Sequence, residues 1–161
     1  MATSAADALA RETTIAGVLR TTCVQLTEVL DADACNLSRV IGQLLVDLVE
    51  YAKDGRTIQL GRSYLLPDFP VTQQVIEEGA PRTVWLLDPG VDPNEATLLR
   101  ELDFDALLML PLQLAGRCWG LLEVYRTGER PFADDDVRRG VELAAEAGVV
   151  LEDLQRRAAA A

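Results

Sequence analysis

The chain has 161 residues, of which 49% are hydrophobic and 25% charged, with a net charge of −11 and a pI near 4.4. This length and composition predict one globular domain, and the acidic balance argues against binding to nucleic acid or to an anionic membrane, since both need basic patches. No apolar run approaches the roughly 18 residues of a membrane span, and no signal peptide is visible at the N-terminus, so we expect a cytoplasmic location.

The chain contains no histidine and only three cysteines, Cys23, Cys35 and Cys118. The absence of histidine removes the commonest general base and the commonest haem and zinc ligands. The cysteines are odd in number and form no CxxC pair, so we interpret them as reduced core residues. We therefore expect no catalysis, no metal and no cofactor.

Hydrophobic periodicity and turn signals predict helices and strands along most of the chain. In chain order these are a helix over 5–30, strands over 34–41 and 44–52, an extended piece over 57–66, a short helix over 70–78, a strand over 83–87, a short helix over 94–102, strands over 106–114 and 118–126, and a helix over 134–157. Tight connections at Gly42-Gln43 and Ala115-Gly116 favour an antiparallel sheet in an α+β domain.

The last predicted helix carries two apolar stripes, whereas one is enough to cover a sheet. The stripes are Val137, Val141, Ala144, Gly148 and Leu151, and Leu143, Ala147, Val150 and Leu154. Two stripes indicate burial on two sides. Either the two terminal helices pack on each other, or they also meet the helices of a second copy, and we expect a homodimer through about residues 5–30 and 134–157.

The predicted strand CWGLLEVYR separates by alternation into two unlike faces. One face is small and apolar: Cys118, Gly120, Leu122 and Val124. The other holds Trp119, Leu121, Glu123 and Tyr125. A carboxylate in the middle of so apolar a strand is costly unless it is hydrogen-bonded, so Glu123 calls for an explanation.

Residues 107–152 resemble the C-terminal half of a GAF domain. The features that carry the resemblance are a Pro-Leu pair, a turn, a strand with an early glycine, a loop ending in Phe and an acidic helix start: Pro111-Leu112, Gly116, Gly120, Phe132 and Asp134 to Asp136. Residues 61–84 also resemble a stretch of many GAF domains. The order of elements matches over 10–155, which implies an N-terminal extension over 1–9 and a C-terminal tail over 156–161.

The resemblance implies a GAF-like α+β fold: a central antiparallel sheet of five or six strands, terminal helices on one face, and short helices and loops enclosing a pocket on the other. Family members bind cyclic nucleotides, tetrapyrroles, amino acids or other small effectors, and many have no known ligand. We therefore expect a non-catalytic signalling module that binds an unknown small-molecule effector and acts on an output domain or a partner signalling protein. The alternative is a GAF-like dimerisation module with no ligand.

The resemblance also assigns the faces of the strands. The small face of 118–126 would lie under the terminal helices, with Gly120 allowing a helix to approach closely, and strands 34–41 and 118–126 would lie side by side. The residues expected at the pocket are Asn36, Ser38, Tyr64, Phe69, Trp85, Leu107, Met109, Trp119, Glu123 and Tyr125. We expect Glu123 to be ionised beside Asn36 and Ser38. It would bind an amine, amide or ring N–H of a ligand, be satisfied by its neighbours in a structural role, or reach solvent at the pocket mouth.

Several activities of the family do not fit these residues. Bilin-binding members usually attach the chromophore through a Cys often followed by His, whereas Val24, Asn36 and Trp119 follow the cysteines here. Haem-binding members use an axial His, and the NKFDE set of the cyclic-nucleotide phosphodiesterase type is absent. Free methionine-(R)-sulfoxide reductase, a remote alternative, uses cysteines in the cover loops, and residues 55–104 contain none.

Overall fold

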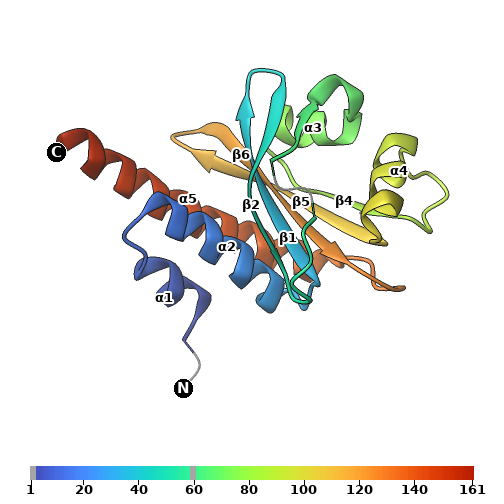
Figure 1. Cartoon of the computed structure of the whole chain (residues 1–161), viewed down its shortest axis with the longest axis horizontal. Helices are drawn as coiled ribbons and strands as arrows, with labels where there is room; N and C mark the ends of the chain where they lie inside the picture. Colours follow the sequence, from blue (N-terminus) through green and yellow to red (C-terminus); the bar gives the residue numbers. More distant parts are fainter. Residues whose placement is uncertain (1–2, 59–60) are drawn as a thin grey trace.

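The computed structural model describes residues 3–58 and 61–161. Gln59 and Leu60, which belong to the predicted extended piece over 57–66, lie outside the described residues. The helices are α1 (Ala5–Ala10), α2 (Ile15–Val29), α3 (Pro70–Glu78), α4 (Pro93–Leu102) and α5 (Asp134–Ala160), with a single 3-10 turn over Leu66–Asp68 (Figure 1). The strands are β1 (Ala34–Ile41), β2 (Leu44–Ala52), β3 (Ser63–Leu65), β4 (Arg82–Trp85), β5 (Ala106–Leu114) and β6 (Arg117–Arg126).

The strands form one six-stranded sheet in the order β3-β2-β1-β6-β5-β4. Every neighbouring pair is antiparallel, which confirms the predicted α+β class and the antiparallel sheet. The predicted strand over 83–87 ends early, at Trp85, because the chain turns there: the amide of Asp88 donates to the carbonyl of Trp85 at 3.1 Å.

The single helix predicted over 5–30 is wrong, because two helices occupy that span. Thr14 starts the second one: its hydroxyl accepts a hydrogen bond from the amide of Gly17 at 3.0 Å. Threonine is a favoured residue at this capping position. Helix α1 then folds back onto α2 and α5, and its Leu9 is fully buried in the core that these helices share with the sheet.

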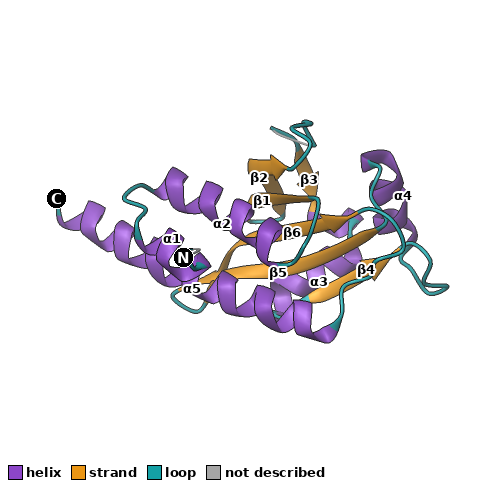
Figure 2. Ribbon diagram, turned by 90° about the horizontal axis from the view of Figure 1, so that it is seen from below, coloured by secondary structure: helices purple, strands orange, loops and turns teal. Residues whose placement is uncertain are grey.

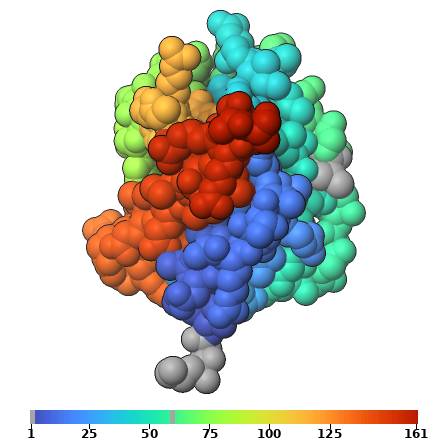
Figure 3. Space-filling model, turned by 90° about the vertical axis from the view of Figure 1, so that its left-hand side faces the viewer, coloured from blue at the N-terminus to red at the C-terminus, as the bar shows by residue number. Residues whose placement is uncertain are grey.

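Helices α2 and α5 lie side by side on one face of the sheet, α2 against β1 and β2 and α5 against β5, with α4 at the opposite end of the sheet from the C-terminus (Figure 2). The C-terminal part of α5 and the N-terminal helices share one surface of the molecule (Figure 3). Apolar residues of the sheet form the core under these helices: Cys35, Leu37, Ala106, Leu108, Leu110, Leu112, Leu114, Leu122 and Val124. Arg126 of β6 is also buried on this side, where its guanidinium pairs with Asp136 of α5 at 3.2 Å and donates to the carbonyl of Leu30. This side of the sheet is an ordinary hydrophobic core, and it accounts for the small face predicted for Leu122 and Val124.

Glycines in α5, and not the glycine in β6, set the close approach of helix to sheet. A Cβ added at Gly148 would lie 2.5 Å from the carbonyl oxygen of Gln113 in β5, and one added at Gly140 would lie 2.9 Å from Leu110. At Gly120 the added atom would instead meet the backbone of the neighbouring strand, 2.6 Å from the carbonyl of Ser38. Glycines of α5, and not Gly120, therefore allow the close approach of helix and sheet.

Both apolar stripes of α5 are used within the chain, except for the exposed Val141 of the first stripe. The second stripe packs into the core that α5 shares with α1 and α2, with Leu143 and Ala147 buried and Val150 and Leu154 half-buried. Contacts inside one chain thus explain the second stripe without a partner. A third line, formed by Val141, Ala145 and Val149, is exposed on the outside of α5.

Helices α3 and α4, strand β3 and the 3-10 turn cover the other face of the sheet; we call them the cover. A second hydrophobic cluster joins the cover to the sheet: Ala34, Leu45, Leu66, Val75, Val84, Leu99, Phe104, Leu107, Met109, Leu121 and Tyr125. Within residues 3–58 and 61–161, no helix combines the length and apolar character needed to cross a membrane.

Candidate functional site

Strands β1 and β6 bring the predicted polar residues together on the cover-facing side of the sheet. Asn36 lies directly opposite Glu123 in the β1–β6 register, and Tyr125 belongs to the cluster under the cover. Asn36 and Ser38 are fully buried, and Glu123 is 5% exposed. Glu123 therefore does not reach solvent as a pocket-mouth residue would.

The shortest hydrogen bond to Glu123 comes from Tyr125, while Asn36 also interacts with its carboxylate. The Tyr125 hydroxyl donates to Glu123 Oε2 at 2.6 Å, and the Tyr125 ring stacks on Phe104 with centroids 4.8 Å apart. Asn36 and Ser38 donate to Asp47 Oδ1, at 2.9 and 2.6 Å. Two adjoining hydrogen-bonded groups therefore lie on this face, one around Glu123 and one around Asp47.

Burial raises the pKa of Glu123 to about 7, against the lowering effect of the hydrogen bonds from Tyr125 and Asn36. The charges of Glu95 and Asp47 raise it further. A carboxyl group with this pKa is ionised in about half of the molecules at neutral pH, so the expectation that Glu123 is ionised stays a prediction.

Asp47 in β2 and Glu95 in the cover helix α4 are two further buried carboxylates, and neither was among the predicted site residues. Asp47 is 4% exposed and Glu95 is 1% exposed. Glu95, from α4, accepts a hydrogen bond from the hydroxyl of Thr72 in α3 at 2.6 Å. Burial raises the pKa of both carboxyl groups, although their hydrogen bonds act in the opposite direction.

Both residues could have been found in the sequence, because each is a charged residue at a position where the pattern predicts an apolar one. Asp47 interrupts the apolar run LLVDLVEYA in the same way as Glu123 interrupts its own strand. Glu95 stands where the apolar stripe of α4, with Leu98, Leu99 and Leu102, has its first position. The face of Asp47 also depends on a bulge in β2, where Leu37 pairs with Val49 but Ser38 pairs with Asp47.

The space between the carboxylates and the cover is nearly closed. A cavity of about 10 Å³ is lined by Leu45, Tyr64, Leu66, Phe69, Thr72, Leu98 and Glu123. That volume is close to the least that holds one water molecule. Tyr64 and Phe69 meet edge to face, with ring centroids 5.6 Å apart, and occupy the position where a ligand would lie.

A second hollow of about 430 Å³ lies on the outer side of the same wall. Tyr64, Phe69 and Leu98 line both spaces, so these three side chains separate the inner cavity from the surface. Leu107 and Met109, also predicted for the pocket, are buried in the cluster under the cover. Met109 Sδ accepts from the Thr72 hydroxyl at 3.4 Å.

Trp119 and Trp85 do not lie at the predicted pocket. A β-bulge disrupts the β5–β6 pairing, since Leu112 pairs with Gly120 but Gln113 pairs with Cys118. The extra residue, Trp119, packs against the helix-facing core, because a bulge reverses the alternation of the strand beyond it. Trp85, at the end of the edge strand β4, also packs against the helix-facing core.

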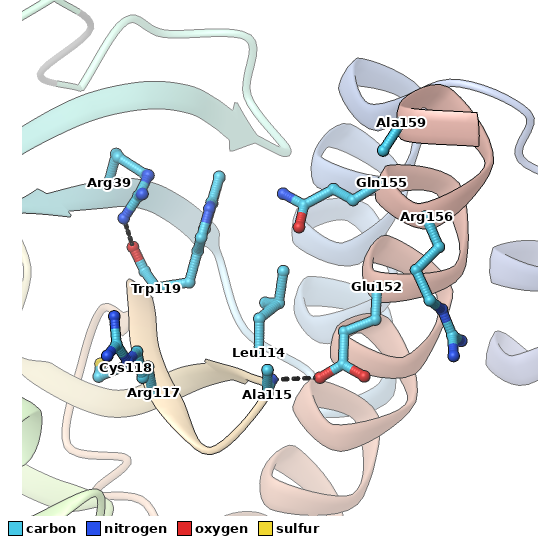
Figure 4. Close-up of a pocket in the computed structure, with 10 residues that line it drawn as sticks. All are labelled: Arg39, Leu114, Ala115, Arg117, Cys118, Trp119, Glu152, Gln155, Arg156 and Ala159. Atoms are coloured by element: carbon cyan, nitrogen blue, oxygen red, sulfur yellow. Dashed lines mark hydrogen bonds between the residues drawn. The ribbon is translucent and has the colours of Figure 1, made fainter. Parts of the chain in front are cut away.

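A larger hollow lies elsewhere, between the β5–β6 hairpin and the end of α5 (Figure 4). It measures about 710 Å³, and Trp119 lies between Arg39 and Gln155 (Figure 4). Two of its charged groups bind the protein's own backbone: Arg39 donates to the carbonyls of Val40 and Trp119 at 2.7 Å, and Glu152 accepts from the amide of Ala115. We therefore place the candidate site at the cover-facing carboxylates.

The GAF domain family model matches residues 14–151, which cover most of the chain and include every residue of the candidate site. The chain belongs to the GAF domain family. The match indicates no catalytic family, and a search of curated proteins gave no match.

Solved GAF-fold structures resemble this domain over nearly its whole length. The blue-light absorbing form of the PixJ GAF domain from Thermosynechococcus elongatus has a TM-score of 0.78 at 18% identity, covering 95% of this chain and 92% of that one. A far-red absorbing protein, JSC1_58120g3, solved in its dark state with bound biliverdin, has a TM-score of 0.80 at 12% identity, with 94% and 97% covered. The chromophore-binding domain of the bacteriophytochrome RpBphP3 from R. palustris has a TM-score of 0.79 at 12% identity, covering 95% of this chain and 60% of that domain. At these identities the likeness shows the fold.

Proposed function

We propose that this GAF domain is a non-catalytic sensor module, which binds a small-molecule effector between the sheet and the cover and passes the signal to an output domain or a partner protein. The observation that carries the proposal is the presence of three buried carboxylates under the cover: Asp47 and Glu123 on the sheet, and Glu95 in α4. The charges of Asp47 and Glu95 act on Glu123, and Glu123 lines a cavity in the place where the family resemblance implies a pocket. Leucine at these positions would bury without the cost of removing carboxyl groups from water. Three such groups under the cover favour a binding role.

The effector need not be a bilin, although the structural neighbours include bilin proteins. Cys23 and Cys35 are buried in the core under the helices, on the far side of the sheet from Glu123. Cys118 lines the hollow near the end of α5. No thiol of the chain lines the inner cavity, so covalent attachment of the kind usual in bilin-binding relatives finds no support there.

The protonation of the cysteine thiols supports the proposal that the domain is non-catalytic. Burial raises the pKa of the Cys35 and Cys118 thiols, which lowers the thiolate fraction that a nucleophile or reductant needs. A methionine sulfoxide reductase activity would also need cysteines in the cover, and residues 55–104 contain none.

The second candidate is a dimerisation module with no ligand. The small volume of the cavity favours it, since Tyr64 and Phe69 fill the space that an effector would occupy. The polar character of the cavity floor favours the sensor. The two functions differ in whether Glu123 acts on a ligand or only on the fold.

Dimerisation through the terminal helices is part of both candidates, and we propose that it uses the exposed line of α5. Val141 and Val149 are 41% and 66% exposed there. Ile15, at the start of α2, is 38% exposed. Exposed aliphatic side chains spaced along a helix are typical of a helix–helix contact.

The deciding experiment is a native mass spectrum of protein purified without denaturation, followed by release of any bound molecule. A stoichiometric small molecule on the wild-type protein supports the sensor. Glu123→Gln should then weaken its binding by about 1.5 to 3 kcal/mol, the range for a hydrogen bond to a charged group. If the mutation changes stability equally with and without the molecule, Glu123 has a structural role and the ligand-free module is favoured.

A further inference from the structure

We infer that the effector of this site is a small organic cation, whose N–H groups bind Asp47, Glu95 and Glu123 on the cover-facing side of the sheet. The inference rests on the sensing function proposed above and names the chemical class of the ligand. It is carried by the balance of charge and hydrogen bonds among the buried side chains of this face.

The three carboxylates have only uncharged hydrogen-bond donors around them. Tyr125 donates to Glu123, Thr72 donates to Glu95, and Asn36 and Ser38 donate to Asp47. None of the salt bridges among residues 3–58 and 61–161 includes any of the three. Arg62, exposed at the rim, favours the ionised form of Asp47 less than these hydrogen bonds do. Buried carboxylates normally have a cationic partner, and here the protein supplies none at hydrogen-bonding distance.

Two buried acceptor atoms on the same face have no hydrogen-bond partner among the described residues. They are Asp47 Oδ2 and Asn36 Oδ1, and their side chains are 4% and 0% exposed. The orientation of the Asn36 amide is determined, because its NH₂ group must face the carboxylate of Asp47. Both open positions therefore accept hydrogen bonds, and a ligand that satisfies them must donate.

A donor with positive charge fits all of these groups, whereas an anion or a pure acceptor fits none. An ammonium, amidinium or guanidinium group offers several N–H bonds and the missing charge. A metal ion is a poorer match, since no cluster of three metal-binding side chains occurs in the described part of the chain.

The wall of the cavity suits the rest of such a ligand. Tyr64 and Phe69 present aromatic rings between the carboxylates and the outer hollow of about 430 Å³, and aromatic faces attract cations. Asp68 and Glu101 line that hollow, in a chain whose net charge is −11. Rotation of Tyr64, Phe69 and Leu98 would join the inner and outer spaces, and the field of the protein favours entry of a cation.

The test compares probes of the same shape and different charge on the wild-type domain. Benzamidine, benzamide and benzoate form one set, and butylguanidine, butylurea and pentanoate form the other. Calorimetric titration at pH 7 should show the cation of at least one set binding tenfold or more tightly than its neutral counterpart. Binding should also release protons, measured as a dependence of the heat on the buffer, because Glu123, with its pKa raised to about 7, is partly protonated beforehand.

Variants locate the site. Asp47→Asn, Glu95→Gln and Glu123→Gln each keep an acceptor oxygen and remove one charge, and each should weaken the cation tenfold or more. Glu146→Gln removes the same charge from the exposed face of α5 and should leave affinity unchanged. If a variant fails to fold, the titrations of the wild-type domain with cationic and neutral probes still test the inference.

Three results would overturn the inference. The first is that neutral or anionic probes bind as tightly as the cations. The second is that a molecule released from the purified protein carries no positive charge. In both cases the domain still binds a small molecule, so the sensing function stands. The third is that no probe binds and no molecule co-purifies, and this removes the cation and the sensor together.

Discussion

The two faces of the same sheet follow different rules. The side under α2 and α5 is largely apolar, with the buried Arg126 paired to Asp136 of α5 at its end, and glycines bring α5 into direct contact with the β5 backbone. The side under the cover buries Asp47, Glu95 and Glu123, and Glu123 lines a cavity of about 10 Å³. Adjacent residues of one strand, such as Leu122 and Glu123, thus belong to opposite regimes. The helix-facing side therefore stabilises the folded domain, while the cover-facing side buries carboxyl groups that lower the stability of the domain.

The strongest test of the helix-facing side is Leu122→Ala. Leu122 is fully buried between the sheet and the helices, so its truncation should lower the free energy of unfolding by about 2 to 5 kcal/mol. Denaturant titrations at pH 5 and pH 8 should give the same loss, because no titratable group is removed. A loss below 1 kcal/mol would show that this face is not the well-packed core described above.

The cover-facing side should instead respond to pH. The pKa of Glu123 rises from 4.5 to about 7 on folding, so the folded state binds more protons than the unfolded state between these values. The contribution of Glu123 to the free energy of unfolding is complete below pH 4.5 and is lost as the pH rises through 7. The free energy of unfolding should therefore fall by about 3 kcal/mol over this range. Burial raises the pKa of Asp47 and Glu95 as well, which adds to the same slope.

Glu123→Gln provides the control for this effect. The variant keeps a buried polar group of the same size but cannot ionise, so its stability should depend less on pH between 5 and 8, and it should be more stable than wild type at pH 8. Thermal melts across this range measure the difference. Parallel curves for the two proteins would contradict the raised pKa.

Gly148→Ala should cost about 1 to 3 kcal/mol, the usual effect of overpacking. The added Cβ would lie 2.5 Å from the backbone oxygen of Gln113, and this clash should outweigh the better helix propensity of alanine, worth about 1 kcal/mol. Val149→Ala changes the next, exposed residue and should stay within about 0.5 kcal/mol. If Gly148→Ala is stabilising, α5 has room to move away from the sheet.

The smallest expected effect on monomer stability is that of Val149→Asp, which tests the dimer. Val149 is 66% exposed, so the charge should leave the fold intact but abolish a dimer that uses the outer line of α5. Leu154→Asp is a poorer test, because Leu154 packs against the core and would weaken the monomer itself. Sedimentation at tens of micromolar distinguishes a monomeric from a dimeric variant. If the oligomeric state is unchanged, the outer line of α5 has no role in dimerisation.

Strand alternation predicted much of the fold and part of the site. It placed Asn36, Glu123 and Tyr125 on one face because regular strands alternate without exception between bulges. The bulges themselves are set by tertiary pairing, so Trp119 and Asp47 could not be assigned to their faces from sequence. The break between α1 and α2 was missed because a threonine cap barely disturbs the spacing of apolar residues from which the helix was predicted. Tyr64 and Phe69 were expected at the cavity, but their role in closing it depends on packing.

The glycine contacts between α5 and β5 have a mechanical consequence. At Gly148 the helix meets the backbone oxygen of Gln113 with no side chain between them, so this contact has no rotamer that can change to absorb a displacement. β5 also carries Met109, which touches Thr72 beneath the cover. Any shift of β5 caused by an occupant of the cavity would therefore reach α5 as a rigid-body movement. Helix α5 is 27 residues long, about 40 Å, and its far end would amplify a small tilt at the sheet into a larger displacement at the C-terminus.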